Sequence, residues 1–199
     1  MLKPYLYGNV TEAGCDEAGR GCLAGPVVAA AVILPKKYRN PLINDSKKLS
    51  PKIRAELKEE IIEAALAWSV AFTGNMEIDR LNILRATMKA INEAVNQLKV
   101  KPELLLIDGN RFFSSDNIKY KTIVGGDSLF MSIAAASILA KTFRDEYMMQ
   151  IHNEYPVYGW DKNKGYGTAF HRRAIIEYGI SPYHRRSFTL INPQLKIDF

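Results

Sequence analysis

Residues 14–34 read GCDEAGRGCLAGPVVAAAVIL and place two acidic residues between apolar stretches. Asp16 and Glu17 close a short strand candidate, Thr11–Glu17. Pro26–Leu34 is a run of small and β-branched residues that two prolines bound, which is typical of a buried strand. The glycine-rich turn between the two segments predicts an antiparallel hairpin. The two acids are therefore expected where the first strand of a sheet ends.

The rest of the chain alternates between strand and helix patterns. Further strands are expected at Trp68–Thr73, Glu103–Asp108 and Ile118–Val124. Helices are expected at Pro51–Ala67, Glu77–Leu98, Ser128–Tyr147 and Thr168–Tyr178. The first of these helices has Ser50 as its N-cap and Pro51 at its first position. This order predicts a single α/β domain over residues 1–199, with a five-stranded mixed sheet flanked by helices and a small helical C-terminal region.

The charge balance favours a polyanionic partner. The chain of 199 residues has 27 Lys and Arg against 21 Asp and Glu, a net charge of +6. Residues 160–199 contain seven basic residues and three acidic ones. We therefore expect residues 155–199 to form a basic region that contacts the substrate backbone.

Targeting signals and redox chemistry point to the cytoplasm. The N-terminal stretch has no apolar core of a secretion signal, and no run of about 18 apolar residues occurs. Cys15 and Cys22 match neither a zinc spacing nor a disulfide framework. A cytoplasmic protein without membrane segments, and a monomer, is expected.

Acidic residues recur where strands end. Asp108 closes an apolar strand, and the carboxyl ends of strands border the ligand crevice in open α/β sheets. A lone Asp after a strand is more often a turn or cap residue, but if this strand neighbours the first one, three acids converge. Because adjacent strand residues face opposite sides, Asp16 and Glu17 cannot both point to one spot from an ideal strand. Asp127, in VGGDS, is either a fourth ligand or the N-cap of the next helix.

Clustered carboxylates favour a site for divalent cations. Such groups repel one another, and bound cations remove the conflict. An all-oxygen ligand set selects Mg²⁺ or Mn²⁺, and a pair of these ions suits phosphodiester hydrolysis. Asp145 lies 18 residues after Asp127, which is about 27 Å along a straight helix. One pair of metal ions cannot be bound by both residues if the helix starts near Asp127, so Asp145 is expected either to support the ligand residues from behind or to be structural.

Six blocks of the sequence resemble the ribonuclease HII family, the type 2 ribonucleases H of bacteria. The blocks are GCDEAGRGCLAGPVVAAAVIL, NDSKKLS, LLLIDGN, the GGD before SIAAASILAKTFRDEYM, NKGYGT and YHRRSF. The resemblance implies a ribonuclease H-like fold and a metal-dependent endonuclease that uses two divalent ions, Mn²⁺ or Mg²⁺, during catalysis. It also implies cleavage of RNA in RNA–DNA hybrids and 5′ to ribonucleotides embedded in DNA, with 3′-hydroxyl and 5′-phosphate ends, and thus a part in ribonucleotide excision repair.

The resemblance also assigns roles to particular residues. The acidic ligands of the family fall on Asp16, Glu17, Asp108 and Asp127. Its substrate-contacting residues fall on Gly19, Arg20, Gly21 and Tyr166, of which Tyr166 stacks on the sugar. The resemblance also favours phosphate contacts by Lys47 and Lys48. Without it, a solvated loop explains these two lysines equally well. A close glycine backbone can tell a ribose 2′-hydroxyl from its absence. The final residues 197–199, IDF, are open to a second interpretation as a short peptide that binds a partner protein.

Other interpretations remain at the sequence level. Residues 19–24 satisfy the G-x-G-x-x-A dinucleotide fingerprint, but a strand follows where that motif needs a helix. A hybrid-binding module without catalysis, and the same nuclease fold acting on other nucleic acids such as DNA junctions, stay open. His152, His171 and His184 have no zinc spacing and are expected to be structural or surface residues, with His171 near enough to the tyrosine loop to touch a phosphate.

Overall fold

The hairpin predicted from the glycine-rich turn is present in the computed structural model, which describes residues 2–191. β1 (Glu12–Ala18) and β2 (Val27–Ile33) pair antiparallel, with Asp16 opposite Ala30. All of β2 is buried, as its run of Ala and Val requires in a strand covered on both faces. The hairpin therefore forms the centre of the sheet.

The sheet has five strands of mixed direction, as the sequence predicts. Its order is β3-β2-β1-β4-β5, where the three strands outside the hairpin are β3 (Ala67–Thr73), β4 (Leu104–Asp108) and β5 (Lys119–Ile123). β2 is antiparallel to both of its neighbours, while β4 is parallel to β1 and to β5. β5 is an edge strand with exposed lysines, which discourage pairing with another chain. β1 and β4 are thus parallel neighbours that end at the same edge.

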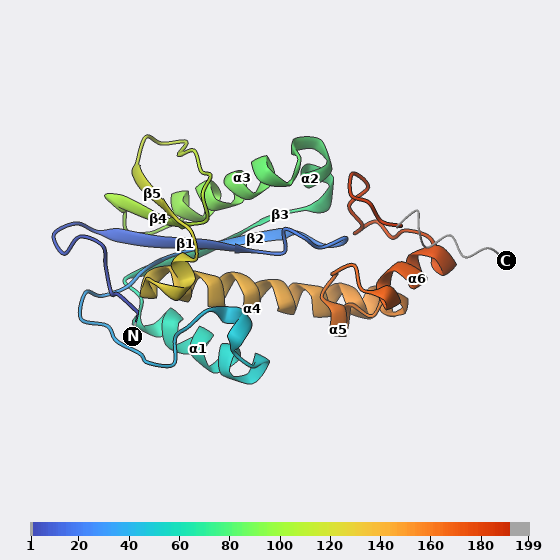
Figure 1. Cartoon of the computed structure of the whole chain (residues 1–199), viewed down its shortest axis with the longest axis horizontal. Helices are drawn as coiled ribbons and strands as arrows, with labels where there is room; N and C mark the ends of the chain where they lie inside the picture. Colours follow the sequence, from blue (N-terminus) through green and yellow to red (C-terminus); the bar gives the residue numbers. More distant parts are fainter. Residues whose placement is uncertain (1, 192–199) are drawn as a thin grey trace.

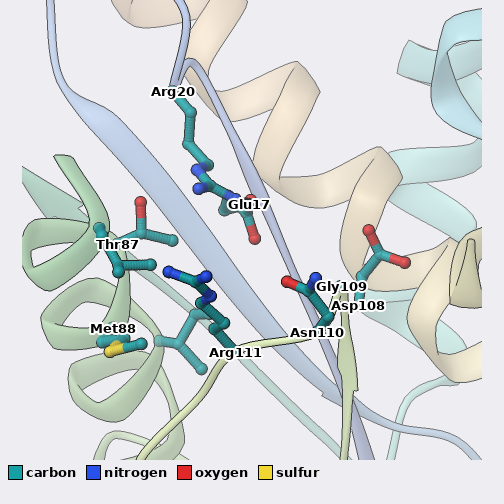
Figure 2. A pocket seen from close by; sticks show the side chains of 10 residues that line it. Glu17, Arg20, Thr87, Met88, Asp108, Gly109, Asn110 and Arg111 are labelled. Carbon is teal, nitrogen blue, oxygen red and sulfur yellow. Dashed lines mark hydrogen bonds and ion pairs between the residues drawn. The ribbon is translucent and has the colours of Figure 1, made fainter. Parts of the chain in front are cut away.

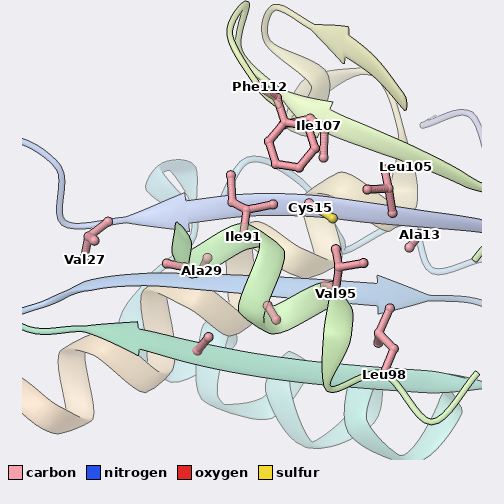
Figure 3. Packing of buried hydrophobic residues seen from close by; sticks show 14 of the residues in the cluster. Ala13, Cys15, Val27, Ala29, Ile91, Val95, Leu98, Leu105, Ile107 and Phe112 are labelled. Carbon is pink, nitrogen blue, oxygen red and sulfur yellow. The ribbon is translucent and has the colours of Figure 1, made fainter. Parts of the chain in front are cut away.

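Helices cover both faces of the sheet (Figure 1). One face carries α2 (Asn75–Leu81) and α3 (Ile83–Asn96), and the other carries α1 (Pro51–Ala64) and α4 (Met131–Glu154). Figure 3 shows Ile91 and Val95 of α3 packed over Cys15 and Ile107 of the sheet. Short elements complete the chain: the 3-10 turns η1 (Ser46–Lys48), η2 (Gly126–Ser128) and η3 (Pro156–Tyr158), and the helices α5 (Trp160–Asn163) and α6 (Ala169–Tyr178).

α4 lies directly against β1 because Gly14 has no side chain. A Cβ at this position would be 2.2 Å from the carbonyl carbon of Ser132, so only glycine allows the two backbones to approach this closely. The first half of α4 is buried almost all round, in agreement with its small and apolar residues. This contact brings the turn that precedes α4, with Asp127, to the edge of the sheet where β1 ends.

Several predicted boundaries are wrong. The single helix expected at Glu77–Leu98 is two helices, because Asn82 has a φ of 68° and its side chain accepts hydrogen bonds from the amides of Leu84 and Arg85. α4 begins three residues later and ends seven residues later than predicted, and α5 was not predicted. Among residues 2–191 no helix combines the length and the apolar character that a membrane span needs.

Candidate active site

Asp16 and Asp108 are neighbours at the edge where β1 and β4 end. The parallel register pairs Cys15 with Ile107, so the next residue of each strand lies beside the other, and partners in a parallel pair face the same side. Both acids therefore face α4. The two strands are therefore neighbours, which is the condition that the sequence analysis set for the acids to converge, and Asp16 and Asp108 face the same side.

The carboxylate of Asp16 is buried and poorly compensated. The residue is 6% exposed. Burial raises its pKa well above the usual range, and the nearby charges of Glu17 and Asp108 raise it further. Opposing this, the amide of Glu17 donates to Asp16 Oδ1 at 2.6 Å and Ser137 provides a side-chain hydrogen bond. No basic side chain is among its main influences, so Asp16 bears its charge at a considerable cost.

Asp127 joins the pair through the main chain of η2. The amide of Gly126 donates to Asp108 Oδ1 at 2.7 Å, which ties the end of β4 to the turn that carries Asp127. Burial raises the pKa of Asp127, followed by the charges of Asp108 and Asp45, while Lys47 opposes them. The alternative role of Asp127 as the N-cap of the next helix is wrong, because α4 begins at Met131 with Phe130 at its cap position.

Glu17 starts on the opposite face of β1 from Asp16 and lies in a hollow that Asp108 also lines. It forms an ion pair with Arg20, whose Nη1 is 3.1 Å from Glu17 Oε1. Burial raises its pKa although Arg20 lowers it, and the charge of Asp108 adds to the rise. Figure 2 shows Glu17 between Arg20 and Asp108 in a hollow of about 380 Å³ that Arg111 also borders. The expected divergence of residues 16 and 17 is therefore present.

The four acids together match the donors that a hard divalent cation needs. All are oxygen donors, and three of them have raised pKa values from burial and mutual repulsion. In residues 2–191, no three His, Cys, Asp or Glu side chains already have the geometry that encloses one ion. The acids are thus gathered at one edge but are not closed around a single point.

Lys47 is a basic residue whose pKa responds to the acid cluster. It lies in η1, and its amide donates to Asp45 Oδ1. Burial works against its charged form, but Asp45 and then three of the clustered acids raise its pKa above the usual range. Lys47 and Lys48 are both exposed in this turn. The acid cluster therefore stabilises the charged form of a lysine that remains accessible.

The Gly-Arg-Gly loop and the Tyr166 loop lie against each other. The amide of Leu23 donates to the carbonyl of Gly165 at 2.7 Å, and Cys22 forms a β-bridge with Tyr166. Tyr166 is 43% exposed. The glycines on either side of it pack tightly, since a Cβ on Gly165 would meet the carbonyl oxygen of Ala24 at 2.6 Å. The ring of Tyr166 is thus held at the surface beside the glycine loop.

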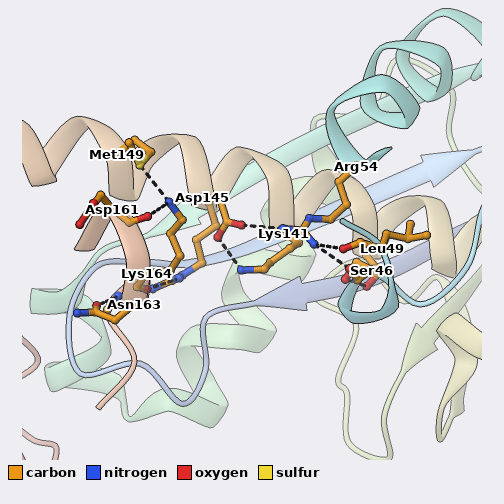
Figure 4. A network of polar contacts seen from close by, with 12 residues as sticks. Ser46, Leu49, Arg54, Lys141, Asp145, Met149, Asp161, Asn163 and Lys164 are labelled. Carbon is orange, nitrogen blue, oxygen red and sulfur yellow. Dashed lines mark hydrogen bonds and ion pairs between the residues drawn. The ribbon is translucent and has the colours of Figure 1, made fainter. Parts of the chain in front are cut away.

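Asp145 contacts basic side chains rather than the acid cluster. Its carboxylate pairs with Lys141 at 2.6 Å and with Arg54 at 3.3 Å (Figure 4). It lies 14 residues into α4, about 21 Å along the helix from Met131. These contacts agree with the predicted structural role.

Two expectations for basic residues are wrong. His171 is fully buried, where its Nδ1 meets the carbonyl of Tyr166 and its Nε2 meets His184, so it cannot touch a phosphate. Arg185, counted in the basic C-terminal region, is also fully buried. The sequence analysis missed Arg144, which is 1% exposed beneath the glycine loop. No motif could have identified the burial of Arg144 and Arg185, because their hydrogen-bond acceptors are main-chain carbonyls. Lys196, Asp198 and the final IDF lie outside the described residues.

Solved structures with this architecture define the class of the fold as ribonuclease H-like. The ribonuclease H2 of Pyrococcus horikoshii OT3 superposes with a TM-score of 0.77 over 90% of this chain and 94% of that chain, at 24% identity. The RNase HII in a PCNA:RNase HII complex from Archaeoglobus fulgidus gives 0.77 over 94% and 98%, at 25% identity. The predicted fold is confirmed.

The chain belongs to the ribonuclease HII family. The family model described as Ribonuclease HII matches residues 13–191. A Ribonuclease HII of Bacteroides thetaiotaomicron is 57% identical, and one of Phocaeicola vulgatus is 55% identical, each over the full length of both chains. The chain is therefore an endoribonuclease, and family membership favours catalysis over a hybrid-binding module without activity.

Proposed function

We propose that this chain cleaves the RNA strand of RNA–DNA hybrids and cuts 5′ to ribonucleotides embedded in duplex DNA, leaving 3′-hydroxyl and 5′-phosphate ends. The observation that supports this most is the parallel register that puts Asp16 beside Asp108, with Asp127 tied to them by the amide of Gly126. Three acids from separate segments meet at one sheet edge.

Asp16, Glu17, Asp108 and Asp127 hold two divalent ions, Mg²⁺ or Mn²⁺. When bound, the ions activate the attacking water and stabilise the leaving oxygen of the phosphodiester. Asp16 and Asp108 face the same side, and together with Glu17 and Asp127 they would supply the oxygen donors that hold the ions. A Bst-RNase HIII of similar fold, with a TM-score of 0.70 over 92% of this chain and 68% of that chain at 20% identity, has been solved in complex with Mn²⁺.

The glycine loop reads the ribose. Gly19 is needed by the fold, because its φ is +94° and a Cβ there would meet Arg144 Nε at 2.0 Å. Gly21 is different, since a Cβ there would meet nothing within 4 Å. The fold therefore gives no reason for a glycine at position 21, whereas a substrate that approaches the main chain does. The main chain of Gly19, Arg20 and Gly21 contacts the 2′-hydroxyl, which both donates and accepts, through groups other than the carbonyls of Gly19 and Arg20, which accept from Arg185.

Tyr166 and the lysines position the nucleic acid. The exposed ring of Tyr166, next to the glycine loop, stacks on the sugar of the ribonucleotide. Lys47 and Lys48 contact phosphates near the acids. The basic region 155–199 adds backbone contacts through exposed residues such as Arg173 and Arg186. The protein acts as a monomer in the cytoplasm, in ribonucleotide excision repair.

The test offers two duplexes of one sequence, one all-DNA and one with a single internal ribonucleotide. The expected result is cleavage only at the 5′ side of the ribonucleotide, in Mg²⁺ or Mn²⁺, and none after chelation. Equal cutting of both duplexes would instead support a nuclease for other nucleic acids. No cleavage of either duplex, or of a hybrid, with either metal would reject the proposal.

A further inference from the structure

Two guanidinium groups lie buried behind the glycine loop. Arg144 is 1% exposed and Arg185 is fully buried. Neither forms an ion pair with a carboxylate among residues 2–191. Burial lowers the pKa of Arg185 to about 10, so the group keeps its charge at neutral pH. A buried cation without an anionic partner is costly unless other dipoles replace its lost hydration.

Main-chain carbonyls supply that replacement. Arg185 donates from Nη2 to the carbonyl oxygen of Gly19 at 2.7 Å and from Nη1 to that of Arg20 at 2.8 Å. Its Nε donates to the carbonyl oxygen of Gly25 at 3.0 Å. These three acceptors lie before and after the turn of the glycine loop. Because hydrogen bonds from a charged donor are the stronger kind, Arg185 fixes both ends of the loop to one rigid plane.

Arg144 joins this loop to the Tyr166 loop. It donates from Nε to Pro26 at 3.0 Å and from Nη2 to Ala24 at 3.1 Å. Its third bond runs from Nη1 to the carbonyl of Lys164 at 2.8 Å, two residues before Tyr166. One side chain of α4 therefore holds both loops at a fixed separation.

The contact with Arg144 also shapes the loop itself. Gly19 sits so close to the guanidinium that any side chain at this position would overlap it. The opposite side of the loop, at Gly21, is open. The guanidinium groups thus lie behind the loop, while its other surface remains free for a ligand.

We propose that Arg144 and Arg185 are positioning residues that set the discrimination between ribose and deoxyribose. They do not touch the substrate. They fix the distance between the main chain of Gly19–Gly21 and the Tyr166 ring. A nucleotide with a 2′-hydroxyl fits between these two groups. The inference rests on the proposed function, in which both loops contact the ribonucleotide.

The test replaces each arginine by lysine, which keeps the charge but loses the planar fork of donors. Arg185→Lys and Arg144→Lys are made in an Asp108→Asn background, so that binding is measured without cleavage. The readout is the ratio of the Kd values for an all-DNA duplex and for the same duplex with one ribonucleotide. The ratio is expected to fall about tenfold, roughly one lost hydrogen bond, while the Kd for all-DNA changes less than about twofold.

Ile61→Ala serves as the matched control. Ile61 is fully buried between α1 and α4, away from both loops, so this variant loses stability while the ratio should stay at the parental value. An unchanged ratio in both lysine variants, or an equal fall in Ile61→Ala, would overturn the inference. If the parent protein itself binds both duplexes equally and the wild type cuts neither, the proposed function has failed instead.

Asp79→Asn tests the same inference if a lysine variant does not fold. Asp79 accepts hydrogen bonds from the amides of Arg186 and Ser187 at 2.9 Å each, and from the Ser187 hydroxyl, and so anchors the segment that carries Arg185. This substitution keeps both guanidinium groups and touches only a partly exposed residue. A several-fold fall of the ratio supports the inference, and the parental ratio contradicts it.

Discussion

The molecule buries charge in two neighbouring regions and compensates it in only one of them. Arg144 and Arg185 each donate three hydrogen bonds to carbonyls, so their burial is satisfied within the fold. Asp16 and Asp127 are also buried, but the nearby negative charge of Asp108 repels both of them. A satisfied buried charge holds structure together, whereas an unsatisfied cluster identifies a place where a ligand must bring opposite charge.

Removing one acid from the unsatisfied region should have the largest effect. We expect Asp108→Asn to lower the cleavage rate by about three orders of magnitude or more, because the ions lose a shared ligand. Folding should be retained or improved, since the substitution relieves like-charge repulsion and the Asn oxygen still accepts from the amide of Gly126. Single-turnover cleavage and thermal unfolding measure the two effects. Cleavage at the wild-type rate would remove Asp108 from the active site.

Tyr166, on the loop that Arg144 holds, should contribute about tenfold to substrate affinity. Loss of a stacking ring costs about 1–3 kcal/mol in binding, so Tyr166→Ala should weaken affinity for the ribonucleotide duplex accordingly. The ring is 43% exposed, so stability should change little. Tyr166→Phe keeps the ring and is expected to bind nearly as well as the wild type. If the two substitutions weaken binding to the same extent, stacking is not the role of this side chain.

The two lysines of η1 sharpen the comparison further. The acid cluster raises the pKa of Lys47, so Lys47→Ala should reduce cleavage several-fold more than Lys48→Ala. Both substitutions remove one positive charge from the same turn, which makes each the control of the other. Steady-state cleavage at low and high salt measures the difference. Equal losses would mean that both lysines act only through the general positive field.

A satisfied charge outside both regions should matter for stability and not for cleavage. The side chains of Asp145 and Arg54 are 16% and 10% exposed, so this pair is more than a surface contact. Asp145→Ala should cost about 1–3 kcal/mol of unfolding free energy, because it leaves Arg54 and Lys141 without their carboxylate. Chemical denaturation measures the loss. A cleavage rate reduced more than about tenfold in the folded variant would instead place Asp145 in the active site.

The sequence predicted the elements whose signals are local. The Ser50–Pro51 pair marks the start of α1, and the Ser50 hydroxyl does accept from the amide of Ile53. The strands that end in acids also follow from their apolar runs. The break at Asn82 could not be predicted, because the apolar periodicity continues through it and only the local hydrogen bonds of the Asn side chain favour the turn.

The site was predictable only in part. Spacing and charge predicted that Asp16 and Asp108 converge if their strands pair, but the place of Asp127 depended on the resemblance to a family. Arg185 was counted among surface charges because its partners are carbonyls about 160 residues earlier in the chain. Carbonyls carry no residue-specific signal, so buried guanidinium groups are invisible to sequence patterns.

Thermal unfolding as a function of pH, with a chelator or with Mn²⁺, tests the central claim that the acid cluster needs divalent ions. Burial and repulsion raise the pKa values of Asp16, Glu17 and Asp127 in the folded chain above the unfolded values near 4. Without ions, their protonated forms therefore support folding below about pH 4, and this support is lost as the pH rises through the folded pKa values. We predict that the Tm of the chelated protein falls as the pH rises from about 4 to 8. Mn²⁺ should raise the Tm most at pH 8. The double substitution Asp16→Asn with Asp108→Asn should abolish the increase in Tm that Mn²⁺ causes. An equal Mn²⁺ effect in the double variant, or none in the wild type, would contradict the account.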